Sequence, residues 1–210
     1  MRHVTPKVVL GVAAVLAVVS ALVDFTTMAE LSGQADTWAS IRKTIARTIN
    51  SGSVWAGLGI LAGFSAGPRR WLRGAALGAG ILLLTTALHY AVGVGVGIVP
   101  ADGFVSNAQW FVAAAVFGLP LGLIGVAAHS HLLARLVLPL GMIAEPWVTR
   151  RFFGFYGNLP SQVSEIASGI ILTLLGVILG VLVLRLRRRT RSTSPAAGSS
   201  DSPPPSADRR

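Results

Sequence analysis

One apolar segment, residues 74–100, limits what this chain can fold into more than any other feature. It contains no Asp, Glu, Lys or Arg, although Thr85, Thr86, His89 and Tyr90 lie in its interior. A helix needs roughly 20 residues to cross the hydrocarbon core of a bilayer, and this segment is long enough. It therefore predicts a membrane-spanning helix whose polar side chains pack against other helices.

The composition supports a membrane protein. Only 12% of the 210 residues are charged and 52% are hydrophobic, whereas a soluble domain has about 25% charged residues. The net charge of +10 comes from basic residues in short clusters between apolar segments, which is typical of cytoplasmic loops under the positive-inside rule. We therefore expect the lipid bilayer, and no nucleic acid, as a partner. The lack of Cys excludes disulfides and Cys-ligated metal sites, and we expect no cofactor and no metal.

The apolar segments predict an all-α fold, a polytopic transmembrane helical bundle with about six spans. We expect one integral membrane domain over residues 1–184. The first segment follows a short basic start and could be a cleaved signal peptide, which would leave five spans. We favour a retained span, because the segment merges into further apolar residues. The spans are expected at about residues 8–28, 54–67, 74–97, 109–128, 132–147 and 166–184.

The longest early loop contains a predicted amphipathic helix at about residues 37–50. Asp36 or Thr37 is expected to cap its start. Four apolar side chains recur on one stripe of this helix: Trp38, Ile41, Ile45 and Ile49. The pattern fits a helix that lies in the membrane interface, and it fits a loop helix on the protein's own surface equally well.

Clusters of arginine predict the orientation in the membrane. We place them in the cytoplasm, which puts both termini there, and the Val, Ala, Gly and Arg content suggests a bacterial plasma membrane. The residues that determine topology are Arg69, Arg70, Arg73, Arg187, Arg188 and Arg189. Residues 185–210 are first basic and then rich in Ser and Pro, so we expect a disordered cytoplasmic tail beside anionic lipid headgroups.

Three ionisable side chains are expected at similar depth in the outer half of the membrane. Counted from the inner ends of their spans at 1.5 Å per residue, His89, Glu145 and Asp24 lie about 22, 20 and 24 Å up. Thr85 lies one turn below His89, and Tyr90 follows it. One hypothesis is that these five residues form an intramembrane polar cluster that lines an outward-opening pocket.

The alternative, which we favour, is structural. His89 would stay neutral and bond to Thr85 or to a backbone carbonyl, while Glu145 and Asp24 would lie among the headgroups and pair with Arg150 or water. No catalytic motif of the common hydrolases, metalloproteases or nucleotide-binding proteins is present.

Several short motifs occur in a characteristic order: Ser51-Gly52-x-x-Trp55 at the start of the second span, an Arg-rich turn, His89-Tyr90, Gln109-Trp110 and Glu145. Over roughly residues 50–147 the chain resembles an uncharacterised family of small bacterial multi-pass membrane proteins of unknown function. The resemblance implies an integral membrane fold and brings no activity with it.

Three classes of function remain open. A structural or regulatory partner of other membrane components comes first, either with another membrane protein or as a homo-oligomer, because small residues spaced for close helix packing are abundant. A small permease, channel or proton-linked transporter comes second, because Pro120 and Pro139 could break helices near the polar cluster. An intramembrane enzyme comes third, since no nucleophile or metal set supports it.

Overall fold

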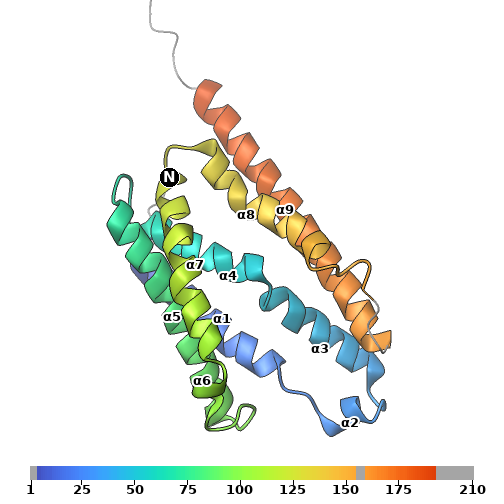
Figure 1. Ribbon diagram of the computed structural model, residues 1–210. Coiled ribbons are helices and arrows are strands. Elements are labelled where there is room, and N and C mark those ends of the chain that lie inside the picture. Colours follow the sequence, from blue (N-terminus) through green and yellow to red (C-terminus); the bar gives the residue numbers. More distant parts are fainter. Residues whose placement is uncertain (1–3, 155–158, 193–210) are drawn as a thin grey trace, which may run out of the picture.

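The computed structural model describes residues 4–154 and 159–192, and these residues form helices joined by short connections (Figure 1). The helices, in chain order, are α1 (Pro6–Val23), α2 (Met28–Leu31), α3 (Asp36–Ile49), α4 (Gly52–Ser65), α5 (Trp71–Gly95), α6 (Gly103–Ser106), α7 (Ala108–Ala127), α8 (Leu132–Val148) and α9 (Leu159–Ser192). The all-α prediction is confirmed for the described part of the chain.

Four of the described helices, α1, α5, α7 and α9, are long and apolar enough to cross a membrane. The other two segments that we expected to span form shorter helices. α4 has 14 residues and α8 has 17, so they are about 21 and 26 Å long, against a hydrocarbon core of about 30 Å. Length and composition thus support four spans rather than six.

Two of the predicted elements, the first span and the last, end at other residues in the structure than we expected. The first span was expected to reach residue 28, but α1 ends at Val23, and α2 begins after a capping box formed by Thr27 and Glu30. α9 continues to Ser192, so the basic segment that we assigned to the tail begins as helix. Residues 193–210, where we expect disorder, lie outside the described residues.

α3 confirms the predicted amphipathic helix but not its cap. The N-cap residue is Ala35, which has no side-chain cap, so the prediction that Asp36 or Thr37 caps the helix is wrong. Arg47 ion-pairs with Glu165 on α9. The apolar stripe faces away from that contact, because Trp38, Ile41 and Ile45 are 56, 49 and 43% exposed.

The core lies where α5 packs against α1, α4 and α7. Glycines permit this close packing. A Cβ at Gly78 would overlap the carbonyl oxygen of Gly118, and a Cβ at Gly122 would overlap that of Gly74. Small residues at such positions let helix backbones approach closely in a membrane, where van der Waals packing drives association.

A second group of helices consists of α3, α8 and α9. α8 and α9 form an antiparallel pair, and α3 packs along α9. Figure 1 shows α3 and α4 following one another along nearly the same line, and their helices are interrupted at Asn50 and Ser51. This helix break joins the core bundle to the second group, and the polar residues described below gather around it.

Candidate functional site

Four polar side chains from α1 and its C-terminal end, from α5 and from the helix break form a chain of polar contacts, here called the relay: Ser20, Asp24, Asn50 and His89. Ser20 lies in the last turns of α1, and Asp24 directly follows that helix. Because the two residues are four positions apart, they share one face of α1. Asn50 comes from the helix break and His89 from α5.

The hydrogen bonds of the relay have a defined direction. Asn50 Nδ2 donates to Asp24 Oδ1 over 3.0 Å, so Asn50 Oδ1 must accept. Ser20 Oγ donates to that oxygen, which commits the only proton of the hydroxyl. Ser20 Oγ lies 3.0 Å from His89 Nδ1 and can then only accept from it. The network thus assigns the imidazole proton to Nδ1.

The remaining contact closes the relay into a ring. His89 Nε2 lies 3.9 Å from Asp24 Oδ2. With the proton on Nδ1, a neutral imidazole would turn its Nε2 lone pair toward a carboxylate, and two acceptors would face each other. One additional proton, on His89 or on Asp24, makes this contact favourable. The relay can therefore accommodate one proton between His89 and Asp24.

The side chains of the relay differ in how far they are buried. Ser20 is fully buried, and the side chain of His89 is 16% exposed, whereas that of Asp24 is 43% exposed. Trp55 and Tyr90 contact the imidazole edge-on, with ring centroids 6.3 and 5.1 Å away. The aromatic rings flank the imidazole, and Asp24 is the more exposed partner of the His89–Asp24 contact.

Tyr90 and Thr85 contribute less than the sequence predicted. Tyr90 also stacks on Phe111, with centroids 5.7 Å apart. Thr85 is fully buried, and its hydroxyl donates to the Ile81 carbonyl of its own helix over 2.6 Å. The side-chain partner of His89 Nδ1 is Ser20 rather than Thr85 or a backbone carbonyl, which we had expected for a structural histidine.

Glu145 does not share the partners of His89. Its carboxylate accepts from the first backbone N–H groups of α4: Gly52 N lies 3.1 Å from Oε1 and Ser53 N 2.7 Å from Oε2. Ser53 Oγ donates to the same carboxylate. A carboxylate is favoured here, because the N–H groups at a helix start lack partners within the helix and carry partial positive charge.

The basic partner of Glu145 is Arg151, whose Nη2 donates to Oε1 over 3.0 Å, rather than the Arg150 that we expected. Arg151 Nε lies 3.8 Å from Glu165 Oε2, and Glu165 in turn pairs with Arg47 over 2.9 Å. This alternating row of charges ties α3, α8 and α9 to the start of α4. Glu145 therefore belongs to a structural network beside the relay.

A third polar contact secures the connection after α1. Arg42 of α3 donates to Glu30 over 2.8 Å and to the Val23 carbonyl over 2.6 Å. The hydrogen bond from Arg42 holds the pKa of the Glu30 carboxyl below its ordinary value. Arg42 thereby fixes the end of α1, and with it the position of Asp24.

The sequence prediction missed Ser20, Asn50, Arg47, Arg151 and Glu165. Ser20 could have been found, because it lies four residues before Asp24 in an apolar helix. The others depend on which helices are neighbours. Within residues 4–154 and 159–192, no three His, Asp or Glu side chains gather closely enough to hold a metal ion.

The fold and these contacts define an all-helical membrane protein with a polar relay at the end of its first apolar helix. Comparison with protein-family models, with curated proteins and with solved structures found no match.

Proposed function

We propose that this chain is a small proton-linked membrane carrier or permease whose proton site is the relay. The observation that supports the proposal is the ring of contacts that joins Asp24, Asn50, Ser20 and His89. Ionisable side chains at membrane depth are costly unless they are compensated, and they commonly mark ion pathways or proton relays. The ring requires one proton to be favourable, which is what a proton-linked carrier needs.

The surroundings of His89 favour a single dominant charge partner. Asp24, from the end of α1, faces the imidazole, and Tyr90 on α5 is its neighbour. Arg42 of α3 donates to the Val23 carbonyl, next to Asp24, and forms its ion pair with Glu30. Proton binding at the relay would strengthen the contact between α1 and α5, and proton release would loosen it.

The helix break supports coupling between proton binding and movement. On one side of the break Asn50, a member of the relay, donates to Asp24. On the other side the backbone N–H groups of Gly52 and Ser53 donate to Glu145 of α8. Discontinuous helices with ions at their ends are a recurring feature of secondary transporters. A change at the relay would therefore act on the junction of the core bundle with α3, α8 and α9.

The proposal also covers the number of spans and the side of the membrane on which the termini lie. We propose six spans with both termini in the cytoplasm of a bacterial plasma membrane, with α4 and α8 crossing as short helices. Figure 1 supports this arrangement, because the α4–α5 turn, the α7–α8 turn and the far end of α9 lie on one side. The resemblance to the uncharacterised membrane-protein family stays a prediction.

The absence of Cys permits a direct test. Single Cys residues at positions 24 and 89 are labelled in intact cells with a membrane-impermeant thiol reagent. We expect labelling at both, because a carrier must admit water to its proton site. Thr86→Cys is the matched control, because Thr86 is buried on α5 and bonds its own helix, and it should stay unlabelled. Labelling at position 24 alone would contradict the proposal.

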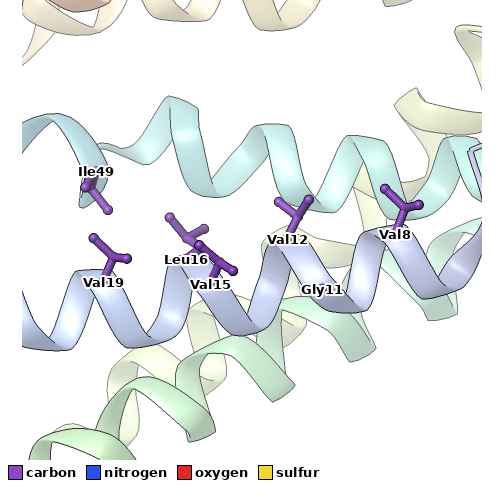
Figure 2. A pocket seen from close by; sticks show the side chains of 7 residues that line it. All are labelled: Val8, Gly11, Val12, Val15, Leu16, Val19 and Ile49. Atoms are coloured by element: carbon purple, nitrogen blue, oxygen red, sulfur yellow. The ribbon is translucent and has the colours of Figure 1, made fainter.

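The second candidate is a structural or regulatory partner of another membrane protein. It is favoured by an open apolar groove of about 530 Å³ along α1, which Figure 2 shows. The groove is lined by Val8, Gly11, Val12, Val15, Leu16, Val19 and Ile49. If position 89 stays unlabelled, the relay is a packed structural feature and this candidate becomes the better one.

A further inference from the structure

A second cavity lies at the opposite end of the core bundle from the relay. It has a volume of about 430 Å³ and lies between the α4–α5 turn and the α7–α8 turn. The residues that line it are Pro68, Arg69, Trp71, Val126, His129 and Ser130. Unlike the groove along α1, this cavity has an arginine, an imidazole and a hydroxyl in its wall.

The cavity carries positive charge that the described part of the protein does not neutralise. Arg69 lines it, and Arg70 and Arg73 are close in sequence. In residues 4–154 and 159–192, none of these three arginines forms a hydrogen bond or an ion pair with another side chain. No Asp or Glu occurs in residues 66–73 or 126–135. An anion from outside the described chain would therefore be attracted here.

Arginines at the other end of the molecule are arranged differently. Arg42 pairs with Glu30, Arg47 with Glu165 and Arg151 with Glu145. The contrast is specific, because the chain provides acids for the arginines that hold α3, α8 and α9 together and provides none beside Arg69.

The wall of the cavity is held in place by contacts of its own. The His129 ring stacks on Phe64, with centroids 3.9 Å apart, and its Nε2 lies 2.9 Å from the Phe64 carbonyl oxygen. Arg135 donates to the carbonyls of Ala128 and His129 over 2.6 and 2.8 Å, which fixes the α7–α8 turn. Arg69 has a φ of 62°, in the left-handed region that non-glycine residues rarely adopt.

We propose that this cavity binds the phosphate group of an anionic phospholipid headgroup. The guanidinium of Arg69 provides charge and paired donors, and Ser130 adds a hydroxyl. Trp71 and the 90% exposed Leu72 begin the 25-residue helix α5 at this point. An indole at the end of a membrane helix lies at headgroup level, so the cavity opens where lipid phosphates are concentrated. Basic pockets between membrane helices bind such headgroups.

The experiment uses the full chain, purified in detergent and depleted of lipid. Phosphatidylglycerol and phosphatidylcholine of the same short chain length are titrated, and the bound lipid is counted by native mass spectrometry. We expect at least fivefold tighter binding of phosphatidylglycerol. Arg69→Gly should remove this preference, because glycine tolerates the positive φ and keeps the turn while the guanidinium is lost.

The matched control is Arg73→Gln, which removes one charge close to the cavity without altering its lining. We expect it to change phosphatidylglycerol binding by less than twofold. Equal weakening by both variants would overturn the proposal, because binding would then follow the overall positive charge. Inorganic phosphate and glycerol phosphate form a separate arm, and displacement of the lipid by either at equal concentration would show a site for free phosphate and overturn the lipid assignment.

Discussion

At the scale of single residues, the closest packing in the molecule depends on the absence of a side chain. α5 approaches α7 so closely that a Cβ at Gly78 would overlap the backbone of Gly118 and Gly122. Gly80, two positions along the same helix, faces open space, with no atom within 4 Å of a Cβ placed there. The two glycines therefore have different roles although they lie only two positions apart.

This difference gives a paired prediction. Gly78→Ala should lower the free energy of unfolding by about 1–3 kcal/mol, because neither backbone can move aside without loss of packing. Gly80→Ala should raise the free energy of unfolding by up to about 1 kcal/mol, because alanine favours the helix. Chemical unfolding of the purified protein in detergent measures both. Equal effects would show that α5 and α7 do not meet at Gly78.

The ion pair of Glu30 with Arg42 gives a pH-dependent prediction outside the spanning helices. Because the hydrogen bond from Arg42 lowers the folded-state pKa of Glu30, the unfolded chain binds the proton more tightly. The stabilisation is therefore complete above the unfolded-state pKa, about 4.3, and is lost as the pH falls through the folded-state pKa. Unfolding measured from pH 7 down to pH 3 should show this loss.

Glu30→Gln tests the assignment of that pH dependence. The variant should be less stable than the parent protein at pH 7 and should approach it at low pH, because the amide does not titrate. A stability difference that stays constant over the whole pH range would mean that Glu30 does not carry the effect. Thr27, whose hydroxyl accepts from the Glu30 N–H over 3.3 Å, keeps α2 capped in both proteins.

At the scale of helices, the start of α4 depends on a carboxylate from α8. Glu145→Gln should lower the free energy of unfolding by about 1–3 kcal/mol, because its amide group would face the backbone donors of Gly52 and Ser53 and would leave Arg151 only its longer contact with Glu165. Ser53→Ala removes one donor to the same carboxylate and should cost less. Unfolding in detergent ranks the two, and a larger loss for Ser53→Ala would contradict this account.

The sequence predicted the apolar helices well, because hydrophobicity and length alone decide them. The span expected at residues 74–97 is α5, Trp71–Gly95, and that expected at 109–128 is α7, Ala108–Ala127. The ends of α1 and α9 were less accurate. The capping box at Thr27 and Glu30 starts a new helix after α1, and hydropathy gives no signal where an apolar helix continues into a basic one.

The candidate site was predicted in part, and the reason is geometric. Counting residues gives depth along a helix, and depth placed His89 and Asp24 together correctly, since their side chains lie 3.9 Å apart. Depth gives no lateral position, so it could not show that Glu145 faces the start of α4. Asn50 was expected at the end of a helix, and only the contact of the helix break with α1 gives it a place in the relay.

At the scale of the whole molecule, the two ends differ in how their positive charge is balanced. Arg42, Arg47 and Arg151 pair with acids near the relay end. The other end contains Arg69, without a protein partner among the described residues. Uncompensated arginines favour the cytoplasmic side of a membrane, so this asymmetry predicts that the end with Arg69 faces the cytoplasm.

The number of spans has its own test, because six and four crossings place the same positions on opposite sides once the N-terminus is fixed in the cytoplasm. If α4 and α8 cross, an N-terminus in the cytoplasm puts Val105, after α6 begins, outside the cell and Ser130, between α7 and α8, inside it. If only α1, α5, α7 and α9 cross, each of these positions changes side.

Single Cys residues at 105 and 130, both exposed positions, are labelled with an impermeant reagent before and after permeabilisation. We expect position 105 to react in intact cells and position 130 only after permeabilisation, because α4 packs within the core bundle against α5 and α7 and could not do so from outside the membrane. The reverse pattern would reduce the protein to four spans.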